Sequence, residues 1–438
     1  MKSTLENHTP NKCERLVTDE TDFAPNNYHV KNWEFFLLGF SIFSYVIDVF
    51  FDMNLAVNFY KKGEITYANL TILFVLIPSF ITIAVSLRWY FMDETEKKHR
   101  SSRTCWCFRV IVMMLQLAPV LRYVDSLCHA WKCRRAERRK DTLKQRQYYK
   151  LMLKEDADAA LLRVFECFLE AAPQLVLQMT IIMIQTANMK LEDVSKLSLS
   201  QAPQALSILT SLVSIAWSMA SYQRSIRFAQ DDKLNLSIAG SMLHFTWHIL
   251  IAVSRILSFS VLASVYSLYT GCIAIGHWLL MVFWLIVWRR PRGCEGHHFI
   301  WTGALCWVLG LVYLFVYIST REGRTRNFYL LYYAVFFLEN LGMLGAYTSY
   351  FLSDDSLVKP IYFSPVLVGA SVSFFAGLIA MLVYYGWFHP VTDGKFDDTR
   401  QDMTPASSPN NSTAKVPLQN DQELVEIDLN NQHDIDKI

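Results

Sequence analysis

Charged residues are scarce in this sequence. Only 18% of its 438 residues are Asp, Glu, Lys or Arg, whereas 53% are hydrophobic and 14% are aromatic. A typical soluble protein carries about 25% charged residues, and it seldom has apolar runs long enough to cross a bilayer. Several apolar runs here reach that length. The composition therefore excludes an ordinary soluble domain and predicts an all-α polytopic membrane protein.

Disulfide, metal and catalytic patterns are also lacking. The nine cysteines are scattered without a repeated C-x-x-C pair, so we expect neither a disulfide framework nor a metal site. No GxSxG, HExxH, Walker A or strand-flanked GxGxxG motif is found. We therefore expect no enzyme activity, no cofactor and no nucleic-acid partner. A cleavable signal peptide is not expected either, because the first apolar run is too long for one.

The apolar runs and the basic clusters between them predict the topology. The most basic stretch, residues 128–155, is expected to be a cytoplasmic loop under the positive-inside rule. Placing every basic cluster in the cytoplasm requires the runs near 105–127 and 299–318 to be re-entrant half-helices. The other runs give eight transmembrane helices in two pseudo-symmetric repeats, with both termini cytoplasmic. The predicted parts are a tail over 1–31, membrane repeats over 32–236 and 237–390, and a disordered tail over 391–438.

An acidic stripe interrupts the apolar run that begins near residue 159. Glu166, Glu170 and Gln174 follow one another at intervals of four and therefore share one face of a helix. An acidic side chain at the centre of a membrane helix costs about 2.5 to 3.5 kcal/mol on insertion scales. These residues must then face protein, water or polar cargo, which makes them a candidate site. The alternative is a structural role, in which an arginine neutralises a buried acid and holds helices together.

Other intramembrane charges extend this candidate site. Asp48 and Asp52 lie one turn apart in the first apolar run, Arg255 lies in a later run, and Glu339 lies in the second repeat where the first has its acidic stripe. Three interpretations stay open. A row of charges open to the bilayer would guide a zwitterionic lipid headgroup, and a closed row would serve a cation-coupled solute transporter. Charge pairing alone would suit an adaptor that binds a partner membrane protein.

Both tails contain sequences that fit executioner caspases. Cleavage of Asp19-Glu20-Thr21-Asp22 would follow Asp22, and cleavage of Val425-Glu426-Ile427-Asp428 would follow Asp428. Both sites lie in polar segments that we expect to be exposed, where proteolysis is sterically feasible. The C-terminal tail also holds an apolar patch that could dock elsewhere, formed by Leu424, Val425, Ile427 and Leu429.

Four stretches make the sequence resemble the XK-related family, which includes apoptotic lipid scramblases. They are 45–52, 161–175 with its Glu-Ala-Ala-Pro-Gln core, 322–326, and 383–390 with its Tyr-Tyr and His-Pro elements. The resemblance covers about 32–390 and implies eight crossings, two membrane-embedded half-helices and a row of charged residues within the bundle. On this sequence that row would consist of Asp48, Asp52, Glu166, Glu170, Arg255 and Glu339.

The resemblance also implies a function and its control. Some members of the family scramble phospholipids and expose phosphatidylserine in apoptosis after a caspase removes part of a tail. A plasma-membrane scramblase is therefore expected, with phospholipids and an executioner caspase as partners; a single-pass membrane partner and a homodimer both stay open. The nematode member is cut near its N-terminus, which favours Asp22. Vertebrate members are cut in the C-terminal tail, where the intact tail plugs an inner cavity, which keeps Asp428 and the apolar patch as candidates.

Overall fold

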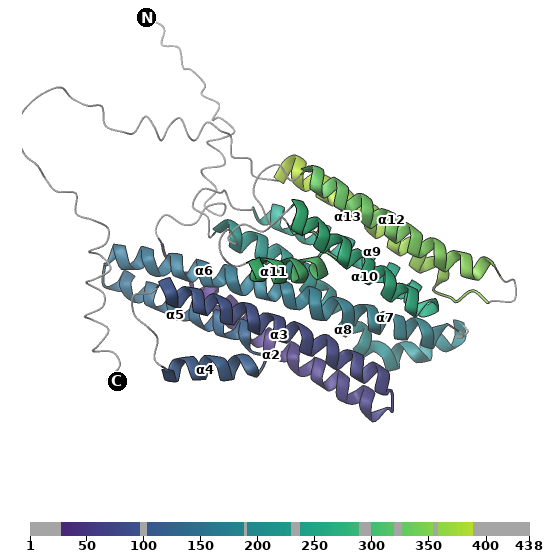
Figure 1. Cartoon of the computed structure of the whole chain (residues 1–438), viewed down its shortest axis with the longest axis horizontal. Coiled ribbons are helices and arrows are strands. Elements are labelled where there is room, and N and C mark those ends of the chain that lie inside the picture. Colours follow the sequence, from purple (N-terminus) through teal and green to yellow (C-terminus); the bar gives the residue numbers. More distant parts are fainter. Residues whose placement is uncertain are drawn as a thin grey trace, which may run out of the picture. The chain divides into compact units, whose positions relative to one another are not determined.

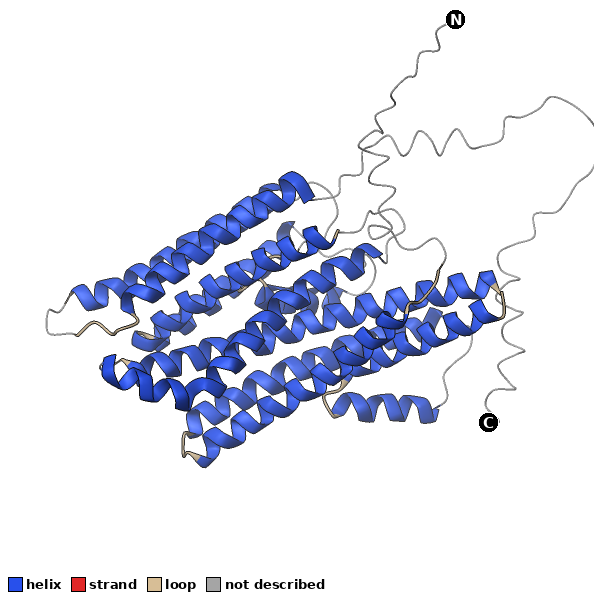
Figure 2. Cartoon of the chain, turned by 180° about the vertical axis from the view of Figure 1, so that it is seen from behind, coloured by secondary structure: helices blue, strands red, loops and turns tan. Residues whose placement is uncertain are grey.

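The computed structural model describes residues 28–96, 103–187, 191–228, 237–288, 299–318, 326–353 and 358–388. Within these ranges the secondary structure is entirely helical, with no strand (Figures 1 and 2). The helices are α2 (Asn32–Lys61), α3 (Ile65–Glu96), α4 (Arg103–Met114), α5 (Ala118–Arg138), α6 (Thr142–Glu166), η1 (Cys167–Ala171), α7 (Ala172–Thr186), α8 (Leu191–Phe228), α9 (Ile238–Val265), α10 (Ser267–Trp288), α11 (Phe299–Val312), α12 (Arg326–Leu352), α13 (Phe363–Val383) and η2 (Tyr384–Phe388).

Seven helical segments among the described residues are long and apolar enough to cross a membrane. They are Glu34–Lys61, Ile65–Asp93, Thr142–Thr186, Ile238–Val265, Ser267–Val287, Asn327–Leu352 and Phe363–Phe388. The chain is therefore a multi-pass membrane protein, as the composition predicts. The predicted count of eight is not confirmed, because the 38-residue helix α8 lies outside this set.

The two segments expected to be re-entrant contain short helices. Helix α4 has 12 residues and α11 has 14. At 1.5 Å per residue each is shorter than the ~30 Å hydrocarbon core. Helix α4 is followed by a break at Gln116, whose φ of +64° is left-handed, before α5 begins. Their lengths do not establish re-entry, so the half-helices and the pseudo-symmetric repeats stay predictions.

Large apolar side chains cover the outer face of the first span. On α2, Phe36, Phe40, Phe43 and Phe50 are each between 56% and 71% exposed. They follow one another at helical spacing and so form one side of the helix. A soluble protein rarely exposes a patch of this kind. We infer that this side of α2 faces lipid, which leaves its opposite side for the bundle.

Helix α9 contacts α7, α8, α10, α12 and α13. Small hydroxyl side chains of α9, such as Ser254 and Ser258, are at most 1% exposed, and small residues allow neighbouring helices to approach closely. At Gly377 of α13, an added Cβ would lie 2.9 Å from side-chain atoms of Ile251 on α9. This packing fixes the position of Arg255, one turn further along α9.

The stretch predicted as a basic loop over 128–155 is instead helical. Helices α5 and α6 pack against each other and are joined by a tight turn, visible at the left of Figure 1. Lys140 in the turn is left-handed (φ +58°), and the side chain of Asp141 caps α6 by accepting a bond from the backbone N–H of Lys144 at 3.2 Å. We call this element the α5–α6 hairpin.

The helix that carries the acidic stripe changes its geometry within the stripe. Helix α6 passes into the π-helical turn η1 and then into α7, and Pro173 lies in the first turn of α7. Proline has no backbone N–H, so it cannot complete the regular hydrogen-bond ladder at this point. Single π-helical turns of this kind occur frequently at functional sites. The distortion shifts the register of the residues before and after it.

Candidate functional site

The acidic stripe is buried within the protein. Glu166 and Glu170 are each 6% exposed, and Gln174 and Gln178 are 3% and 5% exposed. Both carboxylates lie at or within the π-helical turn, which contacts α3, α8 and α11 as well as α6 and α7. The sequence therefore correctly placed these polar side chains away from lipid.

Arg163 compensates the first of these carboxylates. Its Nη1 lies 2.9 Å from Oε1 of Glu166, three residues further along α6, and its Nη2 donates to the hydroxyl of Ser214 on α8 at 3.0 Å. The guanidinium also lies 5.8 Å from the ring of Tyr45 on α2. Arg163 was not among the predicted site residues, although its i, i+3 spacing to Glu166 was a usable signal.

The amides of the stripe have unused hydrogen-bonding capacity. Nε2 of Gln174 and Oε1 of Gln178 are buried and have no hydrogen-bond partner among the described residues. Leaving such an atom unsatisfied costs about 1 to 3 kcal/mol. The two amides lie one turn apart, directly after the distorted turn. A polar group entering here would relieve this cost.

A second cluster surrounds Arg255 of α9, which is fully buried. Its Nη2 lies 2.6 Å from Oε2 of Glu339, and its Nη1 donates to Oδ1 of Asn340 at 2.8 Å, both on α12. Its Nε donates to the backbone carbonyl of Leu314 at 3.0 Å. Arg255 and Glu339, two residues of the predicted charged row, are thus in direct contact, and the arginine also fixes the segment that follows α11.

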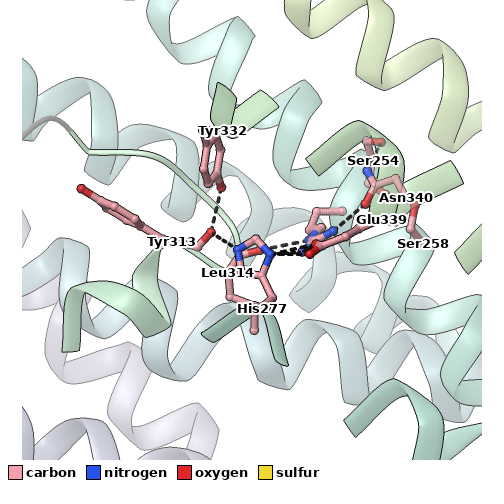
Figure 3. Close-up of polar contacts among 9 residues, drawn as sticks. Ser254, Ser258, His277, Tyr313, Leu314, Tyr332, Glu339 and Asn340 are labelled. Carbon is pink, nitrogen blue, oxygen red and sulfur yellow. Dashed lines mark hydrogen bonds and ion pairs between the residues drawn. The ribbon is translucent and has the colours of Figure 1, made fainter. Parts of the chain in front are cut away.

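His277 of α10 completes this second cluster. Its Nδ1 lies 2.8 Å from Glu339, and its Nε2 lies 3.0 Å from the carbonyl oxygen of Tyr313 (Figure 3). The hydroxyl of Tyr332 donates to the same carbonyl at 2.8 Å. His277 and Asn340 were not among the predicted site residues, although a histidine within a membrane span was a signal. The cluster joins α9, α10 and α12, and it suits a structural ion pair.

A third cluster surrounds Arg122 of α5, whose side chain is also fully buried. Its Nη1 lies 2.7 Å from Glu155, 3.2 Å from Asp93 and 3.5 Å from Asp158. Its guanidinium lies 4.0 Å from the centre of the Tyr90 ring. The cluster ties α3 to both helices of the α5–α6 hairpin. Nothing in the sequence pattern indicated that these three acids meet one arginine.

The remaining predicted site residues lie outside what the structure describes. Asp48 and Asp52 belong to α2, but their side chains are not among those described. The caspase candidates Asp22 and Asp428 lie outside the described residues, as does the apolar patch at 424–429. Within the described ranges, no group of three or more His, Cys, Asp or Glu side chains has the geometry to hold a metal ion.

The fold and its clusters define a class of protein: a multi-pass helical membrane protein with buried intramembrane charges, several of them in ion pairs. A family model for XK-related protein matches residues 36–390. The chain therefore belongs to the XK-related family, which confirms the resemblance found in the sequence.

Two curated relatives extend this comparison. The chain is 28% identical to Cell death abnormality protein 8 of Caenorhabditis briggsae and 29% identical to the protein of the same name from Caenorhabditis elegans. In each case the alignment covers 86% of this chain and 82% of the relative. The similarity therefore spans most of the chain rather than a single motif.

Proposed function

We propose that this protein is a plasma-membrane phospholipid scramblase that exposes phosphatidylserine during apoptosis. Membership of the XK-related family and the cell-death names of its nematode relatives support this assignment. The observation that carries it is the buried stripe, in which two carboxylates are followed by two amides with unsatisfied atoms. Such a stripe suits a transient polar cargo better than a permanently closed core.

The chemistry of the stripe fits a zwitterionic headgroup. The ammonium of choline or ethanolamine would be attracted to the carboxylates, and the phosphate would be attracted to Arg163 and to an amide N–H. Asp48 and Asp52 follow Tyr45 by three and seven residues, the spacing of one helix face, and Tyr45 lies against Arg163. The proposed lipid pathway therefore runs between α2 and the stripe. Movement of phospholipids along this pathway in both directions would need no energy source.

Arg255 and Glu339 have a different place in this proposal. Each is held by several partners within the second cluster. We assign them to fixing α9 against α12 beside the pathway rather than to contacting each passing headgroup.

Regulation is part of the proposal. A caspase would cut after Asp22 or after Asp428 and relieve inhibition by the corresponding tail, with Leu424 to Leu429 as a plug in the C-terminal case. Both termini would be cytoplasmic, where caspases act. A single-pass membrane partner or a second copy of the chain would assist export or assembly.

Scrambling of a fluorescent lipid in liposomes tests the proposal. Purified protein is compared before and after executioner-caspase treatment, with Asp22→Ala and Asp428→Ala variants alongside. Activity should appear after cutting and be lost in one of the two variants. The double variant Asp48→Ala with Glu170→Ala should fold but not transfer lipid. The variant Thr270→Val removes a buried hydroxyl that bonds only the backbone carbonyl of Tyr266, just before α10, and should retain transfer. Normal scrambling by the double variant would exclude the pathway.

An adaptor function is the second candidate. The Arg255 cluster favours it, because a fully paired network holds helices together without needing a cargo. An adaptor would be cut without moving lipid, and it would co-purify with a partner membrane protein. A solute transporter would instead show saturable uptake of a soluble compound.

A further inference from the structure

The last residues before α2 are fixed against the α5–α6 hairpin. Nε and Nη2 of Arg134 donate to the backbone carbonyl of Val30 at 3.2 and 2.9 Å, and Nε2 of Gln145 donates to the carbonyl of Tyr28 at 2.9 Å. Val30 is fully buried, and the ring of Tyr28 packs edge-on against Tyr149 at 5.8 Å. Both helices of the hairpin therefore hold this segment, which we call the strap (residues 28–32).

Side chains add to these backbone contacts. Nδ1 of His29 lies 2.6 Å from Glu137, and the guanidinium of Arg146 lies 5.6 Å from the Tyr28 ring. The thiol of Cys133 lies 3.3 Å from the carbonyl of Tyr28, and burial raises the pKa of Cys133 to about 11, so the thiol stays protonated and can donate. Tyr28 is also left-handed (φ +46°), a conformation that needs such support in a residue other than glycine. The chain thus leaves the hairpin surface at a defined point.

The hairpin surface next to the strap is strongly basic. Between residues 132 and 150 the sequence has nine basic and two acidic side chains. Arg138, Arg139 and Lys140 form the tip, and all three are exposed. No ion pair involves them among the residues that the structure describes. Arg138 also lines a cavity of about 490 Å³ beside His29 and Lys31 of the strap.

An acidic segment is tethered to this surface by the strap. Three of the four residues Asp19-Glu20-Thr21-Asp22 are acidic. From Asp22 to Tyr28 the chain can span at most about 20 Å when fully extended. The hairpin tip lies only about 8 Å along α5 from Cys133, which contacts Tyr28, since a helix rises 1.5 Å per residue. The acidic segment can therefore reach the tip, and a short tether gives it an effective concentration on the order of millimolar.

We propose that residues 19–22 dock on the basic tip formed by Arg138, Arg139 and Lys140. The docked segment lies across the hairpin, and Asp22 is then shielded from protease. The strap stays bound after a cut at Asp22, because its contacts begin at Tyr28. Docking itself does not depend on lipid transfer, but its role as a brake on cleavage rests on the caspase site of the proposed function.

The rate of caspase cleavage tests this docking. The full-length protein is treated with limiting executioner caspase at low and high salt, and a free Asp-Glu-Thr-Asp peptide corrects for effects of salt on the enzyme. The variant Arg138→Gln, Arg139→Gln, Lys140→Gln should be cut about five-fold faster than wild type at low salt, as expected for three exposed charge pairs. The difference should shrink at high salt, which screens exposed charges. A matched variant, Lys61→Gln, Lys62→Gln, Lys359→Gln, removes three exposed charges elsewhere and should behave like wild type.

A cross-linking experiment separates docking from cleavage. Photo-activatable benzoylphenylalanine in place of Thr21 should cross-link to peptides of the α5–α6 hairpin in wild type, and should lose these cross-links in the tip variant. If cross-links form but Asp22 is not cut, docking stands and the caspase part of the proposed function fails. Equal cleavage rates in wild type and tip variant, or cross-links to lipid or to other helices, would overturn the docking.

Discussion

Arg163 lowers the free-energy cost of burying the acidic stripe in the folded protein. The stripe places two carboxylates within one turn in a nearly water-free position, and Arg163 compensates Glu166 at 2.9 Å. Such pairing does not by itself add much stability, because desolvation of both charges offsets their attraction. The pair matters for stability because removing one partner leaves the other charge buried without compensation.

The substitution Arg163→Ala should therefore destabilise the protein strongly. It leaves Glu166 in a buried position without its ion pair, and breaking a buried pair costs about 3 to 5 kcal/mol. Thermal unfolding of the purified protein in detergent should show a clearly lower midpoint. Adding Glu166→Gln to the same chain should recover most of the loss, since a neutral amide is cheaper to bury. An unchanged midpoint in the single variant would show that the ion pair has no structural role.

The residues of the second cluster show how far sequence can identify a site. Arg255 and Glu339 were both predicted, because a charge in a lipid-length run needs a partner. His277 and Asn340 were missed, since their roles depend on α10 and α12 both facing Arg255. Periodicity indicates which residues share one face of a helix. It does not indicate which faces of different helices meet.

At the scale of elements, the contact between α9 and α13 depends on one glycine. An added Cβ at Gly377 would lie 2.9 Å from the Ile251 side chain and 3.3 Å from its backbone nitrogen. The substitution Gly377→Val should therefore destabilise the protein by about 1 to 3 kcal/mol through overpacking. Gly369→Ala on the same helix is the control, because its nearest neighbour is 3.8 Å away. Thermal unfolding in detergent measures both, and equal midpoints would contradict the close contact.

The π-helical turn is the element that links fold and proposed function. Pro173→Ala would restore a backbone N–H four residues after Leu169 and favour a regular helix through the stripe. Regularisation would rotate Glu166 and Glu170 relative to the two amides. We expect lipid transfer to fall while the melting temperature is kept or raised. If hydrogen exchange shows a regular helix and lipid transfer is unchanged, the π-helical turn is not required for transfer.

The α5–α6 hairpin shows that a segment expected to be a cytoplasmic loop can be helical. The positive-inside rule assigns a basic stretch to the cytoplasm, and a non-membrane segment is easily taken as a loop. The composition also carried the helical signal, because residues such as Arg, Lys, Gln and Leu dominate 132–153 and are good helix formers. Asp141 supplies a helix N-cap at the turn. A polar segment outside the membrane can thus be as regular as a span.

At the scale of the whole molecule, hydropathy predicted the class correctly, and its count of eight crossings stays a prediction. Seven described segments qualify as spans, and α8 is a further long helix outside that set. Its second half contains the apolar run expected to cross, with Ile215 and Ala216 fully buried against neighbours. Hydropathy depends on a length threshold and on where charges interrupt a run. Such a threshold is a poor guide to whether short helices, such as α4 and α11, cross the membrane. The same holds for a helix flanked by polar turns.

Sidedness can be measured without deciding the count in advance. The strap binds the α5–α6 hairpin, so we expect the start of α2 and Lys140 on one side of the membrane. The 30-residue helix α2 should then carry Lys62 to the other side. A cysteine replacing Lys62 should react with a membrane-impermeant maleimide on intact cells, whereas one replacing Lys140 should react only after permeabilisation. Wild-type protein, with its nine native cysteines, provides the background.

An epitope tag after residue 438 then decides between odd and even numbers of crossings. With eight crossings the tag lies on the same side as Lys140, and an antibody should detect it only after permeabilisation. Detection on intact cells would indicate an odd number of crossings and would mean that α8 does not cross the membrane. It would also place the C-terminal tail, with Asp428, beyond the reach of a cytoplasmic caspase. The tag therefore tests the regulatory part of the proposed function together with the topology.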